Sequence, residues 1–333
     1  MVKIFDTVAI GQAIVDVLAP VNFDFITDHG LTKGSTHHIL QHQSDQFLKD
    51  IHPIVITPGG TASNSLSGIA HLGGNVGYIS RMANDYLGKI ILQHLKQDGI
   101  TFSKKPSQHA LGTGRCLSLI TPDADRTMVT YLGISHTFSE DDLDYEFLKS
   151  TKSLLVEGYQ CETPSMFQTT EIAVKCAKKE GALIAMSSAH TQCMERYRHQ
   201  LLPFIKEFLD VFISNDEEIM ALTGTESLED AKKIAKTLCP ITVMTCGPKG
   251  AYIVTPHDDF FVAPPSVSKV IDTTGAGDQY LAGFLYALTQ GKTLEECGAM
   301  ASKCAGKIIQ HVGARPTFKK SASVSSFHMS QAI

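Results

Sequence analysis

The residue pattern with the clearest chemistry is Gly275-Ala276-Gly277-Asp278, which lies between an apolar strand-like run and an apolar helix-like run. Glycines allow a tight turn and let the backbone approach a ligand closely. The free N–H groups and the positive dipole end of the following helix favour an anion such as a phosphate. A carboxylate at Asp278 can accept a proton from a hydroxyl beside that anion. The alternative is an ordinary glycine turn capped by an acid, because short glycine patterns are weak signals.

A second set of polar residues and glycines comes later in the chain than the predicted first strand, which covers residues 7–11. Asp16 lies just past that strand, where a carboxylate can accept hydrogen bonds from two vicinal hydroxyls of a sugar. Gly59 and Gly60 let the backbone approach the same ring, and the amide of Asn64 both donates and accepts. The alternative is that Asp16 and Asn64 are a surface turn residue and a helix-start residue.

The elements that must position these groups alternate between short apolar strands and amphipathic helices. This alternation predicts an α/β fold with a mostly parallel sheet that helices cover on both faces. The predicted strands are 7–11, 76–80, 153–157, 182–186, 210–214 and 241–245. The predicted helices are 61–73, 85–98, 164–180, 196–208 with a candidate kink at Pro203, 227–238, 276–289 and 294–311.

Two stretches interrupt the alternation. Residues 16–57 are extended and polar in character, and residues 113–131 hold two β-rich runs around a Pro-Asp-Ala-Asp turn signal. The second stretch predicts a hairpin, and a hairpin inserted into an α/β core is a candidate lid. Arg126 at its tip either reaches a phosphate when the lid closes or is an exposed turn arginine.

Composition limits the class of protein. The 333 residues carry 29 Lys and Arg against 34 Asp and Glu, a net charge of −5, which gives no support for nucleic acid as a partner. No apolar stretch approaches the roughly 18 residues that a membrane span needs, and the start of the sequence does not resemble a signal peptide. The eight cysteines form no C-x-x-C pair, which is typical of reduced thiols. We therefore expect a cytoplasmic protein.

Five motifs, in order along the chain, resemble those of the PfkB/ribokinase-like family of small-molecule kinases. Residues 272–278 (DTTGAGD) match its C-terminal signature, and residues 58–64 (PGGTASN) match its N-terminal glycine signature. Residues 11–16, 215–218 and 245–250 are similar to its strand-end, N-x-x-E and nucleotide-turn elements. The resemblance implies one ribokinase-like domain over residues 1–333, with a Rossmann-type core of mostly parallel sheet flanked by helices. It also implies a small β-sheet lid, formed by segments at about 14–52 and 112–135.

The resemblance further implies phosphoryl transfer from ATP, with Mg²⁺, to an alcohol. Asp278 would be the catalytic base, and the amides of Gly275, Ala276 and Gly277 would form the anion hole. The implied ATP and phosphate ligands are Asn215, Glu218, Thr245, Gly247 and Gly250.

Metal ions would be held in two places. Asn215 and Glu218 would hold Mg²⁺ indirectly, since amide and carboxylate oxygens suit the hydrated ion. Read alone, Asn215 fits a helix cap, and residues 245–250 fit a plain β-turn. A monovalent cation such as K⁺ would lie at Asp272 and Thr274, or Asp272 orients the loop. His38 and His42 are four residues apart but lack the further ligands of a metal site.

Within the family, residues 25–34, 60–65 and 112–116 resemble those of adenosine kinases. This implies that the 5′-hydroxyl of adenosine receives the γ-phosphate, giving AMP in purine salvage. The implied acceptor-binding residues are Asp16, Gly59, Gly60, Asn64 and Gln12. Gln12 stands where adenosine kinases usually have Asn, so a free sugar such as ribose or fructose, or inosine or guanosine, is the alternative acceptor. A catalytically silent nucleoside-binding protein is a third interpretation. The chain is expected to act as a monomer or as a homodimer paired through its lids.

Overall fold

A computed structural model describes residues 2–123 and 125–316, and a large sheet runs through its centre. The strand order is β14-β13-β12-β11-β10-β9-β1-β5-β6. Neighbouring strands are parallel except for the pairs β12–β13 and β13–β14. The predicted mostly parallel α/β sheet is therefore confirmed. The strands are β1 (Phe5–Ile10), β5 (Val76–Ile79), β6 (Thr101–Phe102), β9 (Thr151–Glu157), β10 (Leu183–Ser187), β11 (Val211–Asn215), β12 (Ile241–Thr245), β13 (Ala251–Val254) and β14 (Asp259–Val262).

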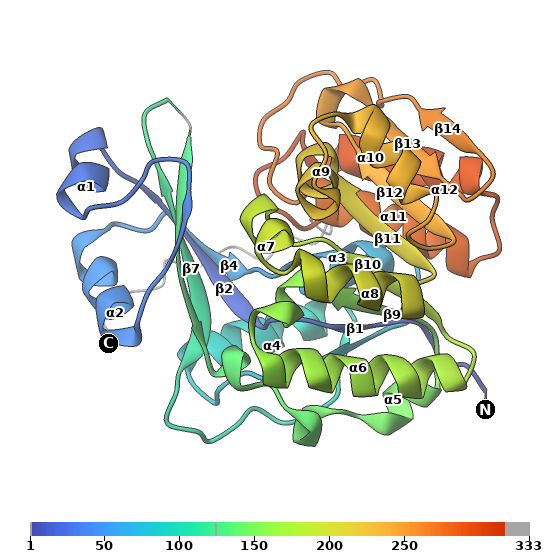
Figure 1. Cartoon of the computed structure of the whole chain (residues 1–333). Helices are drawn as coiled ribbons and strands as arrows, with labels where there is room; N and C mark the ends of the chain where they lie inside the picture. Colours follow the sequence, from blue (N-terminus) through green and yellow to red (C-terminus); the bar gives the residue numbers. More distant parts are fainter. Residues whose placement is uncertain (1, 124, 317–333) are drawn as a thin grey trace.

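Helices cover both faces of this sheet because its strands point apolar side chains to both sides (Figure 1). In β1, Ala9 joins one core cluster, whereas Val8 and Ile10 join the other, as the two-residue period of a strand requires. The first core is covered by α3 (Thr61–His71), α4 (Tyr86–Gln97), α11 (Ala276–Thr289) and α12 (Leu294–Ile308). The second is covered by α5 (Tyr145–Lys149), α6 (Pro164–Lys179), α7 (Thr191–Arg196), α8 (Arg198–Phe208), α9 (Asp216–Thr223) and α10 (Leu228–Ala235).

A separate small sheet stands beside the carboxyl ends of the parallel strands (Figure 1). Its order is β3-β8-β7-β2-β4. β7 (Thr113–Ile120) and β8 (Arg126–Gly133) pair antiparallel, which confirms the predicted hairpin. The other strands are β2 (Ile14–Pro20), β3 (Thr36–His38) and β4 (Val55–Pro58), and β4 lies beyond the segment 14–52.

The prediction of an extended segment at 16–57 was wrong in part, because it contains two helices. These are α1 (Phe23–Asp28) and α2 (Gln41–Asp50). In α1 the carbonyl oxygen of the Asn22 side chain accepts a hydrogen bond from the N–H of Phe25 at 2.8 Å, a local cap. α2 buries only Ser44 and Phe47, so its sequence lacks the apolar periodicity that identifies a helix.

The predicted helix at 196–208 also differs from the structure. The chain breaks at Tyr197, which ends α7 and begins α8, and Pro203 lies inside α8. Because Pro lacks an N–H, it leaves the carbonyl group four residues earlier, that of His199, without its helical partner. That carbonyl belongs to the first turn of α8, so Pro203 is accommodated near the start of a helix.

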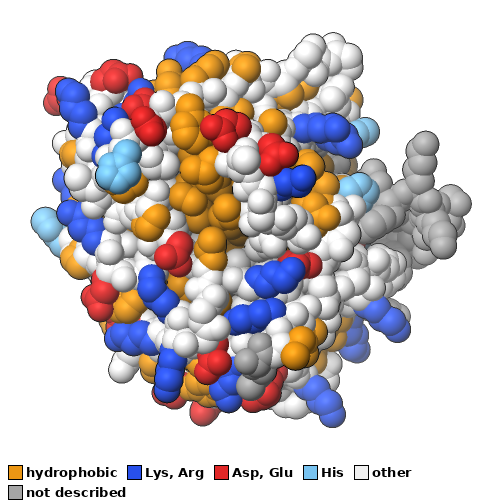
Figure 2. All heavy atoms as spheres, turned by 90° about the vertical axis from the view of Figure 1, so that its right-hand side faces the viewer, with side chains coloured by type: hydrophobic (Ala, Val, Ile, Leu, Met, Phe, Trp, Pro, Cys, Tyr) orange, Lys and Arg blue, Asp and Glu red, His pale blue; other side chains and the backbone are white. Residues whose placement is uncertain are grey.

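The surface also has a groove that lies away from the carboxyl ends of the parallel strands. It lies between β14 and α12 and includes Val262, Pro265, Ala299 and Ser302 in its lining. Figure 2 shows the side of the molecule opposite the small sheet, where apolar side chains gather in a hollow flanked by charged groups. The groove contains none of the candidate site residues. Among the described helices, none combines the length and the apolar character needed to cross a bilayer.

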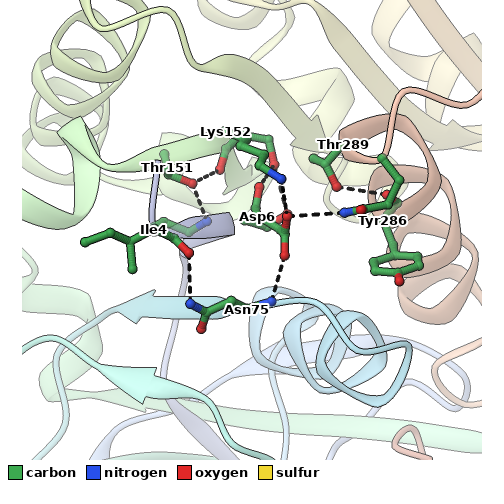
Figure 3. A network of polar contacts seen from close by, with 11 residues as sticks. Ile4, Asp6, Asn75, Thr151, Lys152, Tyr286 and Thr289 are labelled. Atoms are coloured by element: carbon green, nitrogen blue, oxygen red, sulfur yellow. Dashed lines mark hydrogen bonds and ion pairs between the residues drawn. The ribbon is translucent and has the colours of Figure 1, made fainter. Parts of the chain in front are cut away.

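The amino ends of the central strands are held together by Asp6 (Figure 3). Its carboxylate accepts hydrogen bonds from Lys152 Nζ at 2.7 Å, from the N–H of Asn75 at 2.8 Å and from Gln290 Nε2 at 3.2 Å. Burial alone would raise the pKa of Asp6, but the hydrogen bonds from Lys152 and Asn75 outweigh it and lower the pKa. Asp6 therefore joins β1, β9, the turn before β5 and the end of α11.

We expect Asp6→Asn to lower the free energy of unfolding at pH 7 by about 1–2 kcal/mol, because charge-assisted hydrogen bonds are lost. Since the folded-state pKa lies below the unfolded value, this stabilisation is complete above about pH 4. It is lost as the pH falls through the folded-state pKa. Urea unfolding of both proteins at pH 7 and at acid pH checks this, and equal stabilities at pH 7 would contradict it.

Candidate active site

The sequence-predicted groups meet where the carboxyl ends of the parallel strands face the small sheet (Figure 1). Asp278 comes from the first turn of α11, Asn64 from α3 and Asp16 from β2. Asn64 Nδ2 donates a hydrogen bond to Asp278 Oδ2 at 2.9 Å. Two signatures that are 214 residues apart in the chain are thus in direct contact.

The glycine loop before α11 has the conformation expected of an anion site. Gly275 is the N-cap of α11 and has a φ of 76° and a ψ of 5°, in the left-handed region that favours glycine. The N–H of Ala276 donates to the carbonyl oxygen of Thr273 at 3.2 Å. Within the described part of the chain, the N–H groups of Gly275 and Gly277 have no acceptor. They are available to an anion at the positive end of a 14-residue helix.

Asp278 has the electrostatic character of a general base. Desolvation raises the pKa of its carboxyl group to about 6, against the lowering effect of hydrogen bonds from Asn64 and Thr61 and of the charge of Arg315. A base with a pKa near neutrality is mostly ionised at pH 7 and still accepts a proton readily.

Asp16 is packed directly against the glycine signature. A Cβ added to Gly59 would lie 2.4 Å from the carboxylate atoms of Asp16, so a larger residue there would displace that carboxylate. Desolvation raises the pKa of Asp16 to about 7, with Arg315 lowering it and Asp278 raising it. No described residue donates a hydrogen bond to this carboxylate, which is what a site for hydroxyl groups requires.

Glu157, at the end of β9, is a site residue that sequence reasoning missed. Its Oε1 accepts from the N–H of Ala62 at 2.6 Å, and its Oε2 accepts from the N–H of Gln12 at 3.0 Å. It is 1% exposed, and desolvation raises its pKa to about 7. Glu157 therefore joins the segment after β1 to the start of α3. Its position as an acid ending a predicted strand was the available signal.

The side chain of Gln12, which was predicted to bind the acceptor, is only 5% exposed. Its Nε2 has no hydrogen-bond partner among the described residues. The Gln12 side chain lies near enough to Glu162 to lower the pKa of that carboxyl group. Its amide N–H groups remain available to donate to a ligand.

The carboxylate of Asp272 orients the glycine loop. Its Oδ1 accepts from the N–H and hydroxyl of Thr274 at 2.9 and 2.7 Å, and its Oδ2 accepts from the N–H of Gly313 at 2.9 Å. Arg126, at the tip of the small sheet, donates to Asp272 Oδ1 at 2.7 Å and also bonds the Thr274 hydroxyl. These bonds support the loop-orienting alternative. Among the described residues Oδ2 accepts a single bond and a carboxylate oxygen can accept two, so K⁺ at Asp272 and Thr274 stays a prediction.

Asn215 and Glu218 form a capping box at the start of α9. Asn215 Oδ1 accepts from the N–H of Glu218 at 2.8 Å, and Glu218 Oε2 accepts from the N–H of Asn215 at 2.9 Å. Glu218 Oε2 also accepts from the Ser188 hydroxyl. Glu218 Oε1 and Asn215 Nδ2 have no partner among the described residues, so these groups fit both the cap and a site for hydrated Mg²⁺.

The predicted nucleotide turn at 245–250 follows the neighbouring strand β12. Gly247 and Gly250 have φ values of 55° and 96°, and Thr245 Oγ1 donates to the carbonyl oxygen of Ser214 at 3.3 Å. The turn and the capping box end adjacent parallel strands. Within the described residues, no hydrogen bond joins either of them to Asp278 or Asn64.

His38 of the small sheet lies near Glu162 and His190 of the main body. His38 Nε2 is 4.0 Å from Glu162 Oε1, and one ligand atom of each of the three residues lies within 4.8 Å of the others. Burial, and after it the charge of Arg196, lower the pKa of His38, which keeps its imidazole neutral. In addition, His190 Nδ1 accepts from the N–H of Cys193 at 3.2 Å, which leaves the ring proton on Nε2. The cluster is better suited to hydrogen bonding, and His42 is not part of it.

Comparison with protein families gives a match to the pfkB family of carbohydrate kinases over residues 37–321. The chain belongs to that family. It is therefore a phosphotransferase that acts on an alcohol group, and the expected kinase class is confirmed. The match covers both glycine signatures, the Asn215 cap and the site around Asp278.

Individual relatives of this pfkB-family kinase include proteins named for nucleoside and sugar acceptors. The crystal structure of adenosine kinase from Sinorhizobium meliloti has a TM-score of 0.89 and 31% identity, and the alignment covers 94% of this chain and 96% of that one. A probable sugar kinase from Rhizobium etli has a TM-score of 0.90 and 31% identity, with 96% of each chain covered. Adenosine kinase of Saccharomyces cerevisiae is 24% identical over 330 residues, which cover 92% of this chain and 95% of the yeast protein.

Proposed function

We propose that this kinase transfers the γ-phosphate of ATP to the 5′-hydroxyl of adenosine, giving AMP, in purine salvage in the cytoplasm. The observation that carries the proposal is the contact of Asp278 with Asn64 beside the unpartnered loop amides of Gly275 and Gly277. A base, an acceptor-binding amide and an anion site are then within reach of one hydroxyl group.

In this proposal, Asp278 takes the proton of the 5′-hydroxyl as its oxygen attacks the γ-phosphorus. The bond from the γ-phosphorus to the bridging oxygen breaks, and ADP leaves. The N–H groups of Gly275 and Gly277 stabilise the negative charge on the transferring group. Mg²⁺ supplies further neutralisation of phosphate charge when it is bound, and Glu218 and Asn215 are the residues that would hold its water shell.

The small sheet acts in this proposal as a lid of a single kinase unit. Its tip already reaches the glycine loop through Arg126, Asp272 and Thr274. Closure over both substrates excludes water, so ATP is not hydrolysed without an acceptor. Action as a monomer or as a homodimer paired through the lids stays a prediction.

A nucleoside is favoured over a free sugar by the polar groups beyond the predicted sugar site. Gln12 connects the two regions, since its N–H donates to Glu157 Oε2 and its side chain lowers the pKa of Glu162. Beyond it lie Glu162, His38 and His190. These side chains offer hydrogen-bond donors and acceptors that a free ribose would leave unused, whereas a nucleobase can engage them. A free sugar is the second candidate, because one relative is named a probable sugar kinase.

An acceptor panel tests the proposal. ADP release is measured with ATP, Mg²⁺ and adenosine, inosine, guanosine, ribose or fructose. We expect adenosine to give a kcat/KM at least about 10-fold above the others, because each unpaired buried polar group costs about 1–3 kcal/mol. A clearly higher kcat/KM with ribose or fructose would show that the acceptor is a free sugar and not a nucleoside. If none of these acceptors stimulates ADP release, both the nucleoside and the free-sugar candidate are refuted.

A further inference from the structure

The described chain after α12 packs against the glycine loop. The N–H of Gly313 donates to Asp272 Oδ2 at 2.9 Å, and the carbonyl oxygen of Ala314 accepts from Gln279 Nε2 at 3.0 Å. A Cβ added to Gly275 would lie 2.5 Å from the Cα of Ala314. Residues 313–315 therefore form one wall of the loop that precedes α11.

Arg315, the last residue of this wall, reaches the start of α3. Its Nε donates to Asn64 Oδ1 at 3.0 Å, and its second terminal nitrogen donates to the hydroxyl of Ser63. Its first terminal nitrogen lies 3.3 Å from Asp98 Oδ2, and both side chains of this ion pair are only 10% exposed. Arginine carries donors but no acceptor, so the oxygen of Asn64 must face Arg315. The amide nitrogen of Asn64 must then face Asp278, and it donates to Asp278 Oδ2 at 2.9 Å.

Gln279 reinforces this arrangement from the opposite side. The same Nε2 that donates to Ala314 also donates to the main-chain oxygen of Asn64 at 3.0 Å. The main-chain oxygens of Asn64 and Ala314 are thus joined through the side chain of Gln279. The backbone of Asn64 is held by Gln279, while its side chain is held by Arg315.

We infer that Arg315 is a positioning residue for phosphoryl transfer, which orients the Asn64 amide toward Asp278 and supplies a buried positive charge facing Asp278 and Asp16. The inference rests on the proposed role of Asp278 as the base. It assigns no contact of Arg315 with substrate.

The charges around the two carboxylates are few. The charge of Arg315 acts on both Asp278 and Asp16. Asp278 in turn raises the pKa of Asp16 and of Glu157, and Arg126 lowers the pKa of Asp16. Desolvation raises the pKa of both Asp278 and Asp16, and Arg315 opposes that rise in both. Removing its charge should therefore raise the pKa of Asp278 further and leave less of the ionised base at neutral pH.

The test compares Arg315→Met, Arg315→Lys and Arg198→Met. Arg198 is the matched control, since among residues 2–123 and 125–316 its side chain donates only to the main-chain oxygen of Ala221, at 3.1 and 2.7 Å, away from the site. We expect Arg315→Met to lower kcat about 10–100-fold through misplacement of the base and to move the acid limb of the kcat–pH profile to higher pH. Arg315→Lys keeps the charge but not the planar set of donors, so kcat falls while the acid limb stays in place. Arg198→Met changes neither.

The inference would be overturned if the acid limb of the kcat–pH profile were unchanged in Arg315→Met. A structural role would also be indicated if both Arg315 variants lost the same amount of kcat and the same amount of Tm without movement of the acid limb. A second measurement does not need an acceptor. Carbon-13 NMR titration of the carboxyl groups, with Asp278→Asn used to assign the resonance, should give a higher Asp278 pKa only in Arg315→Met. If the wild-type protein phosphorylates no acceptor, the proposed function fails, and this titration still decides the role of Arg315.

Discussion

Asp278→Asn is expected to lower kcat by about 10²–10⁴-fold, the usual contribution of a general base, while acceptor affinity changes by only a few fold. Asparagine keeps the size of the side chain and can still bond the Asn64 amide, so the loss falls on proton acceptance. Steady-state kinetics with the best acceptor of the panel, together with calorimetric binding of that acceptor, measure the two effects separately.

The matched control is Asp230→Asn. Asp230 is the third residue of α10, as Asp278 is the third residue of α11, and it is exposed. This variant should retain the wild-type kcat. In the wild-type protein, kcat should fall as the pH drops through about 6, because the base must be ionised and desolvation has raised its pKa to that value. Turnover of Asp278→Asn at the wild-type rate would remove Asp278 from the mechanism.

Gly275→Ala is expected to reduce both stability and kcat strongly. The φ of 76° is unfavourable for alanine, and the added Cβ would lie 2.5 Å from Cα and 2.6 Å from Cβ of Ala314. The three nearest atoms all belong to Ala314, two of them to its backbone, so no flexible side chain can move away. The loop must therefore rebuild, and its amides lose their alignment. We expect a loss of about 2–4 kcal/mol in stability and about 10²–10³-fold in kcat.

The neighbouring position gives the stability control. Gly277 has no positive φ, and a Cβ added there meets no atom within 4 Å. Thermal unfolding of Gly277→Ala should therefore match that of the wild-type protein, whereas Gly275→Ala unfolds at a clearly lower temperature. If the two variants have the same Tm, the tight packing of Gly275 on Ala314 is not a constraint on the fold.

Local sequence was sufficient for the elements that carry their own signals. The glycine loop, the helix after it and the hairpin of β7 and β8 were predictable because turn residues, apolar periodicity and strand propensity lie within a few residues of each other. The same holds for the capping box of Asn215 and Glu218, where both partners lie in one helical turn. The resemblance to family motifs then indicated which of these elements belong to one site.

The remaining features depend on contacts between distant segments. Glu157 binds residues that precede it by 145 and 95 positions, so its position at the end of a predicted strand marks it as a candidate but does not identify its partners. Arg315 gave no local signal either, since its partners Asn64 and Asp98 lie in two other helical segments. α1 and α2 escaped prediction because the small sheet, rather than an apolar stripe, decides their packing.

The bond between Arg315 and Asn64 has a consequence for the order in which the enzyme is made. Its two ends are separated by 251 residues, so the amide that holds the catalytic carboxylate cannot be fixed until residue 315 has emerged from the ribosome. Earlier parts of a chain tend to fold first during synthesis. The early strands and the small sheet must therefore persist through most of translation with an incomplete site, and kinase activity appears only late in synthesis.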